Sequence, residues 1–323
     1  IRDHCVTGVQ TCALPIWFGV DLTSLKSLHR LCDGRRTLFL VDRAGRLADV
    51  IDVREWVGKD RLDDDDQTGL DVPCARLYEA HARATRDGGH VCLVLSPHQE
   101  IKVFADGAQT FAFAHGRWRV LDPASKFALW RDAVADARLA RVLFQTALEL
   151  AEERKGGLLV VVPDPRLVLG RLIASEDVLE FDRDAEPEPK PPASPSFHDD
   201  VDDDDWTAIL GMGRRCEPLS KRTIHYLAAG RSLLSMDHSV VEALASLDGA
   251  LAVDGEGRLL AFGAILRHDV PPPGASPRSP SRDVAEGART TAAIVASRFG
   301  PVLKISEDGV VSCFLDGDRV WDL

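Results

Sequence analysis

The residues with the clearest potential for chemistry lie in three short stretches near the end of the chain: Asp248-Gly249-Ala250, Gly287-Ala288-Arg289 and Ser306-Glu307-Asp308-Gly309. The second stretch opens an apolar segment with helical spacing, and the free N–H groups at a helix start favour a phosphate. Arg289 would add charge-assisted hydrogen bonds. Asp248, assisted by Glu307, could hold a magnesium or manganese ion between phosphates. In this order and spacing the stretches predict a nucleotide site, although each alone is more typical of a turn or helix start.

The elements that must position these residues follow from hydrophobic periodicity. A hairpin with its turn at Asp254–Gly257 should follow Asp248, because apolar runs flank that turn on both sides. The elements predicted in this part are a helix over His238–Leu247, the hairpin over Ala250–Leu266, a helix from Ala288 to Gly300, a strand and turn over Val302–Gly309, and a closing hairpin over residues 310–323. A partial helix is also expected over Arg222–Leu234.

Short strands and helices also alternate upstream, which is typical of an α/β protein. The predicted elements are a helix over Leu22–Cys32, a hairpin of Thr37–Asp42 with residues 47–53, antiparallel strands over His90–Pro97, Glu100–Gly107 and Arg117–Asp122, one long helix over Ala133–Lys155, and a buried strand over Leu158–Pro163. The pair Gly156-Gly157 separates the long helix from the buried strand, as a helix stop would.

Residues 182–205 differ sharply in composition from the rest of the chain. They are rich in proline and acidic side chains, which cannot supply a core, so we predict a linker there. The predicted domains are an N-terminal α/β domain over residues 17–181 and a nucleotide-binding domain over 206–323, whose central mixed sheet is flanked by helices. Residues 1–16 are set aside, because Val6–Ile16 is similar to a translated sequencing adaptor.

Composition excludes several classes of protein. The chain has 323 residues and a net charge of −12, which argues against a general nucleic-acid surface. Its apolar runs are too short to span a membrane. Seven scattered cysteines without a C-x-x-C pair predict reduced thiols and a cytoplasmic protein. The scattered histidines show no metal or triad spacing. The run Asp63–Asp66 could bind a cation, but a solvated loop is favoured.

The segment from about His225 onward resembles the diadenylate cyclase domain, also called the DisA N-terminal nucleotide-binding domain. The family carries D-G-A before a hairpin, G-T-R-H-R-[ST]-A at a helix start, and a strand ending near S-E or S-Q. The matching stretches here are DGALAVDGEGRLLAFGAIL, GARTTAA and ISEDG. Phe262-Gly263-Ala264 is similar to a divergent branch predicted to serve as sensor domains, in which a Gly-Gly-apolar strand precedes the domain, as in GGLLVVVP here.

The resemblance implies roles for individual residues. Asp248 would bind the metal near the attacking 3′-hydroxyl and would be the catalytic residue of an active enzyme, with Glu307 as a further metal-side carboxylate. In active members, two domains meet face to face as a homodimer and join two ATP into cyclic di-AMP. The residues implied to contact the nucleotide are Asp248, Gly249, Ala250, Gly287, Ala288, Arg289, Thr290, Thr291 and Ser306.

The chain departs from the family within the phosphate motif. Thr290 and Thr291 replace the family's His and second Arg, and Ala288 replaces a Thr. Losing one charge stabiliser commonly costs ~10²–10³ in rate. We therefore favour a sensor or regulatory protein that binds an adenine nucleotide or a cyclic dinucleotide at a degenerate site. Two alternatives stay open: an active diadenylate cyclase in which Arg267 or Arg282 substitutes, and a non-catalytic partner-binding module.

Overall fold

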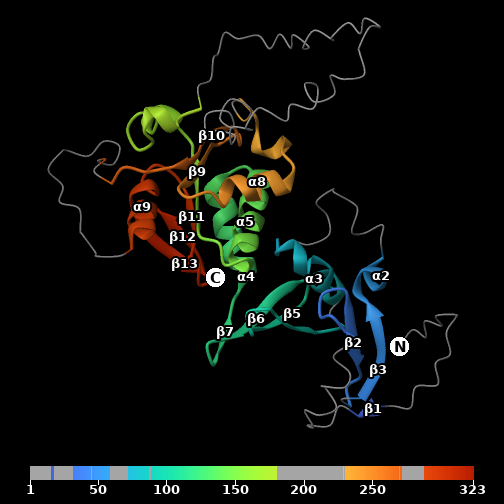
Figure 1. The fold of residues 1–323 in the computed structure, drawn as a ribbon. Coiled ribbons are helices and arrows are strands. Elements are labelled where there is room, and N and C mark those ends of the chain that lie inside the picture. Colours follow the sequence, from blue (N-terminus) through green and yellow to red (C-terminus); the bar gives the residue numbers. More distant parts are fainter. Residues whose placement is uncertain are drawn as a thin grey trace, which may run out of the picture.

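The computed structural model describes residues 16–17, 32–44, 46–58, 72–86, 89–179, 228, 230–268, 270 and 287–323 (Figure 1). Several predicted features lie outside the described residues. They are the adaptor-like segment apart from Ile16, the helix predicted before Cys32, the run Asp63–Asp66, the linker 182–205, most of the partial helix predicted over Arg222–Leu234, and Arg282.

A six-stranded mixed sheet forms the centre of the fold, which confirms a mixed α/β class. Its strands lie in the order β10 (Leu259–Ala264), β9 (Ala250–Asp254), β8 (Gly157–Val162), β11 (Val302–Ile305), β12 (Val311–Leu315) and β13 (Asp318–Asp322). β8 and β9 are parallel, and every other neighbouring pair is antiparallel. Both hairpins predicted in the C-terminal part of the chain, β9–β10 and β12–β13, are present.

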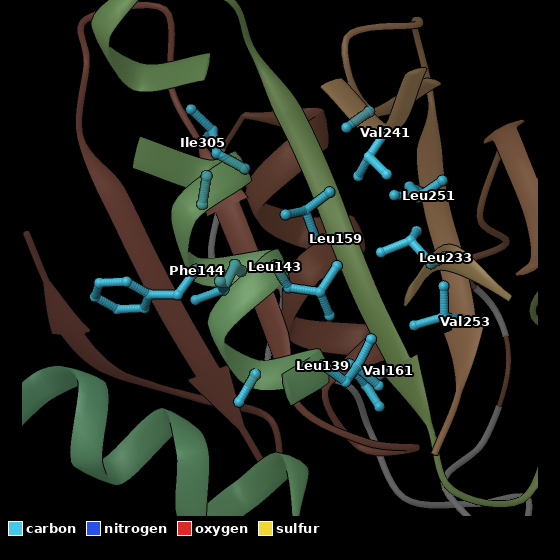
Figure 2. Packing of buried hydrophobic residues seen from close by; sticks show 14 of the residues in the cluster. Leu139, Leu143, Phe144, Leu159, Val161, Leu233, Val241, Leu251, Val253 and Ile305 are labelled. Atoms are coloured by element: carbon cyan, nitrogen blue, oxygen red, sulfur yellow. The ribbon is translucent and has the colours of Figure 1, made fainter. Parts of the chain in front are cut away.

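Helices cover both faces of this sheet. The helices α5 (Ala137–Glu152) and α8 (His238–Ala245) lie on one face, and α9 (Ala288–Ala296) lies on the other (Figure 1). Side chains of a strand alternate between faces, so β8 supplies both layers. Leu159 and Val161 pack with Leu139 and Leu143 of α5, as Figure 2 shows. The alternate residues of β8, Leu158, Val160 and Val162, pack toward α9. This double burial explains why β8 reads as a continuous apolar run.

The sheet takes strands from both sides of the predicted linker. β8 precedes residues 182–205 in sequence, yet it pairs along its length with β9 and β11, which follow them. Helix α5 likewise packs on strands of the C-terminal segment. Residues 182–205 therefore do not divide this sheet into two domains, because β8, one of its two central strands, comes from the N-terminal side.

The single long helix predicted over Ala133–Lys155 is wrong at its start. Two helices are present, α4 (Pro123–Val134) and α5, and the chain turns between them at Ala135, whose φ is 67°. Asp136 caps α5, because its carboxylate accepts a hydrogen bond from the backbone N–H of Leu139 at 2.8 Å. An aspartate before an apolar-periodic segment is a helix-start signal, and it separates the two helices here.

The N-terminal part contains two smaller sheets. The predicted hairpin is present as β2 (Thr37–Val41) and β3 (Arg46–Asp52), with β1 (Ile16–Trp17) beside β3 and α2 (Val53–Val57) after it. The predicted meander has four strands rather than three, since β6 was missed: β4 (Cys92–Leu95), β5 (Ile101–Ala105), β6 (Ala108–Ala114) and β7 (Arg117–Val120). The remaining elements are α3 (Glu79–Thr85) and the 3-10 turns η3 (Arg76–Tyr78), η4 (Pro165–Leu167), η5 (Ser175–Asp177) and η6 (Leu233–Ser235).

Helix α5 also anchors the meander to the larger core. Tyr78 and Phe104 belong to a small buried cluster that packs against Leu148 of α5. The Tyr78 hydroxyl donates to Glu152 Oε1 at 2.5 Å, and Lys102 forms an ion pair with the same carboxylate. One helix thus contacts both cores. No helix within the described ranges is long and apolar enough to cross a membrane.

Candidate functional site

Three chain segments meet at one edge of the large sheet. Leu158 pairs with Ala250, and Gly157 pairs with Ile305, so β8 and β9 begin at the edge where β11 ends. Asp248 lies two residues before β9, and Glu307 lies two residues after β11. Register therefore brings together residues that are far apart in sequence.

Arg289 connects the two carboxylates at this edge. Its Nη2 lies 4.0 Å from Asp248 Oδ1, and its Nη1 lies 3.4 Å from Glu307 Oε1. The three side chains come from the loop before β9, the first turn of α9 and the turn after β11. Asp248, Arg289 and Glu307, which were singled out from the sequence, therefore share one site.

These ion pairs contribute little to folding. The Asp248 side chain is fully exposed, that of Glu307 is 73% exposed and that of Arg289 is 36% exposed. Exposed pairs of this kind contribute little to stability, because solvent screens them. The three charged groups are consequently accessible to a ligand, and exchanging one partner for a ligand group would cost little stability.

Gly156 makes room for the guanidinium, a role that the sequence analysis did not assign to it. A Cβ on Gly156 would lie 2.2 Å from Arg289 Nη1, well inside contact distance. The glycine pair was predicted only as a helix stop. Gly156 also leaves the space in which the Arg289 guanidinium lies. Sequence spacing could not reveal this role, because the two residues meet only through the tertiary fold.

Gly249 holds Asp248 at the start of β9. Its φ is 117°, and an added Cβ would lie 2.4 Å from the backbone carbon of Gly263. A side chain at this position would therefore meet backbone rather than a mobile group. The glycines of D-G-A and F-G-A, quoted above as motif residues, therefore lie against each other, Gly249 just before β9 and Gly263 in β10.

The N-terminus of α9 faces this site without a side-chain cap. Gly287 is the N-cap residue, it makes no capping hydrogen bond through a side chain, and it and Ala288 are exposed. Nothing lies within 4 Å of a Cβ built on Gly287. The first N–H groups of a helix have no acceptor within the helix, so they and the positive end of the dipole are available to an anion.

The other predicted contact residues are less accessible. Ala250 and Thr290 are both buried, Ala250 within the core between α9 and the sheet, so neither side chain is exposed to a ligand. Thr291 and Ser306 are half-buried. A hydrogen bond from the Ser306 side chain holds the pKa of Asp308 below its usual range, so this hydroxyl already serves the turn after β11.

The charge balance of the site indicates that a phosphate would bind together with a metal ion. One guanidinium faces two carboxylates, so the residues alone do not favour a phosphate. Magnesium and manganese are bound in nucleotide sites by one or two carboxylates together with phosphate oxygens. Asp248 and Glu307, which both approach the same guanidinium, fit that donor set. With a divalent ion the local charge would become positive.

A second group of metal-type side chains, which was not predicted from the sequence, lies on the face of the sheet covered by α5 and α8. Glu149 of α5 and His238 and Glu242 of α8 place one donor atom each within 4.8 Å of the others. The signal was present: His238 and Glu242 are four residues apart, on one side of a helix. Glu149, the third member, is 89 residues from His238. The group is therefore recognised only once α5 is seen to pack on α8.

The fold and this edge define a mixed α/β protein with an exposed, charged site at a helix N-terminus. No family model matches the chain, and no curated protein matches it. Among solved structures, a double mutant of DacA from Staphylococcus aureus matches with a TM-score of 0.27 and 16% sequence identity. That match covers 58% of this chain and 87% of the other.

Proposed function

We propose that this protein is a nucleotide-binding sensor or regulatory protein whose site lies at the edge defined by Asp248, Arg289 and Glu307. Its ligand is an adenine nucleotide or a cyclic dinucleotide, bound together with magnesium or manganese. The observation that carries the proposal is the position of Arg289, which lies within 4.0 Å of Asp248 and 3.4 Å of Glu307.

The proposed binding mode assigns separate tasks to these groups. The first N–H groups of α9 and the Arg289 guanidinium bind phosphate oxygens. Asp248 and Glu307 hold the divalent ion, which neutralises charge between the phosphates. Gly287 is exposed and open, so the backbone allows a phosphate to approach closely. The resemblance to the diadenylate cyclase domain supplies the adenine preference.

The composition of the phosphate motif supports binding without efficient turnover. Phosphoryl transfer depends on charge placed around the reacting phosphates. Thr290, in place of the family's His, is buried, and a Thr hydroxyl at 291 carries no charge. Two lost stabilisers, at ~10²–10³ each, leave little useful rate.

Ligand binding is tested by titrating ATP, AMP and cyclic di-AMP into the purified protein with manganese. We expect saturable binding, and a thermal shift that corresponds to about 2.7 kcal/mol when the ligand is at 100 times its Kd. Replacing Arg289→Ala should weaken binding about 10–100-fold, because a hydrogen bond to a charged group is worth about 1.5–3 kcal/mol.

Arg258→Ala is the matched control. Arg258 is also an exposed arginine that pairs with acidic side chains, but it follows the β9–β10 turn at the opposite edge of the sheet. Its loss should leave nucleotide binding unchanged. Equal weakening by both variants, or no thermal shift with any nucleotide, would rule out this site and favour a partner-binding module.

An assay for cyclic di-AMP separates a sensor from an active cyclase. Incubation with ATP and manganese should yield no product above background. Product that disappears in Asp248→Ala would show an active diadenylate cyclase and defeat the sensor assignment.

A further inference from the structure

Glu149, His238 and Glu242 lie at the junction of three elements. Glu149 is near the end of α5, His238 opens α8, and Glu242 is one turn further along α8. Arg76, at the start of η3, donates its backbone N–H to Glu149 Oε1 at 3.3 Å. We propose that these three side chains bind a divalent transition-metal ion such as zinc. The inference does not depend on the proposed nucleotide function.

The donor atoms already face one another. His238 Nε2 contacts Glu149 Oε2, and a Glu242 carboxylate oxygen lies within 4.8 Å of both. A tetrahedral zinc ion with bonds of about 2.0–2.1 Å keeps its ligand atoms about 3.3 Å apart. Small side-chain rotations would bring the three donors to that spacing. The fourth position would remain for water, as in open zinc sites.

Burial makes the group more than a solvated acidic patch. The side chains of Glu149 and His238 are 9% and 10% exposed, and that of Glu242 is 24% exposed. A buried carboxylate is costly unless an opposite charge or hydrogen bonds compensate it. Glu149 Oε1 is directed at Arg76. Glu149 Oε2 and the imidazole nitrogen of His238 therefore face each other between the helices.

Carboxylates outnumber cations around this position. Glu149, Glu153 and Glu242 face Arg76 and Lys155, and the exposed Asp237 caps α8 nearby. Glu153 and Glu242 both lie beside Lys155, so two carboxylates share one ammonium group. A divalent cation removes the repulsion that Lys155 balances only in part.

The mixed donor set determines the class of ion. Imidazole suits zinc and neighbouring transition metals, whereas magnesium and calcium prefer an all-oxygen shell. One imidazole with two carboxylates therefore points to a zinc-class ion. Such an ion would fix α8 against α5, and α8 ends three residues before Asp248 while α5 ends four residues before Gly156. Metal binding would thus stiffen two of the segments that lead to the sheet edge.

Calorimetric titration of metal-free full-length protein with zinc alone tests the site. We expect one ion per chain with a Kd of about 1 μM or tighter. His238→Ala, Glu149→Gln and Glu242→Gln should each weaken binding at least about 10–100-fold, the loss that removal of even an outer hydrogen-bond partner causes. His268→Ala, which removes an exposed histidine, and Asp248→Ala, at the nucleotide site, should both bind zinc as the unaltered protein does.

A measurement on the unaltered protein guards against variants that fail to fold. X-ray absorption of the zinc complex should show one imidazole among oxygen ligands. Absence of zinc binding at about 100 μM, a coordination shell without imidazole, or full retention of binding in a folded His238→Ala variant would overturn the proposal. Because Asp248→Ala removes the nucleotide site alone, failure of the proposed function would be seen separately.

Discussion

At the scale of single residues, the site at the sheet edge depends on two glycines as much as on its charged residues. Arg289 reaches Asp248 and Glu307 across the position that a side chain on residue 156 would fill. Gly249 has a positive φ, and a Cβ at this position would meet the backbone of Gly263. Gly156 affects the position of the Arg289 guanidinium, whereas Gly249 affects the conformation of the backbone.

Two glycine-to-alanine variants should separate these properties. Gly156→Ala meets only the mobile end of Arg289, so its free energy of unfolding should change by no more than about 0.5 kcal/mol. Nucleotide affinity should nevertheless fall about tenfold, equivalent to about 1.4 kcal/mol, because the guanidinium is displaced. Gly249→Ala should lose about 1–3 kcal/mol of stability, because the backbone there is strained for any side chain.

Urea denaturation and nucleotide titration of both variants provide the comparison. Gly287→Ala is a useful third member, because nothing lies within 4 Å of the added carbon. Its fold should be intact, and any loss of affinity would report on the ligand alone. Unchanged affinity in Gly156→Ala would mean that the ligand does not use Arg289 in this position.

At the scale of elements, β8 and α5 decide the architecture. β8 lies between β9 and β11, and α5 packs on β8, β11 and β12. The side chains of β8 alternate between the core under α5 and the core under α9, so the strand contributes to both hydrophobic layers. Removing it would leave two strands with unpaired edges and apolar surface exposed on both faces of the sheet.

The fragment of residues 206–323 should therefore not fold by itself. Its NMR spectrum should lack amide dispersion, and its circular dichroism should indicate little sheet. Adding residues 123–181 as a separate chain should restore both signals, because that piece contains α4, α5 and β8. A folded, soluble 206–323 fragment would contradict the shared sheet and would support the two-domain organisation predicted from the linker.

At the scale of the whole molecule, α5 joins the small core of the meander to the large core. Glu152 binds Tyr78 and Lys102, Glu149 binds Arg76, and Leu148 packs on the small cluster. Each core has a buried cysteine. Burial raises the pKa of the Cys74 thiol, and likewise that of Cys313, to about 12.

Cysteine labelling should show that the two cores unfold together. Near pH 8 both thiols are protonated in the folded protein, because the pKa of each lies well above that pH, and the thiolate is the reactive form. Iodoacetamide should therefore modify neither until urea unfolds the chain, and then both at the same midpoint. Mass spectrometry of peptides that contain Cys74 and Cys313 measures this, and labelling of Cys74 at clearly lower urea would contradict it.

The sequence by itself determined most of the local structure and the identity of the charged residues at the sheet edge. The α8, α9 and hairpin elements follow from hydrophobic period and turn residues, which act over a few neighbours. The sequence also singled out Asp248, Arg289 and Glu307 in advance. Of its errors, the joined helix over Ala133–Lys155 lies at an element boundary, where local signals are weakest, whereas β6 is a whole strand that was missed.

Only the tertiary structure decided which distant segments share a sheet, a pocket for a guanidinium, or a set of metal ligands. The strand β8 joins the C-terminal strands across a proline-rich, acidic segment whose composition is that of a domain linker. Gly156 approaches Arg289, and Glu149 approaches His238, through packing that no spacing in the sequence encodes. Local propensity acts between near neighbours, whereas burial of apolar surface can bring together any two segments whose faces fit.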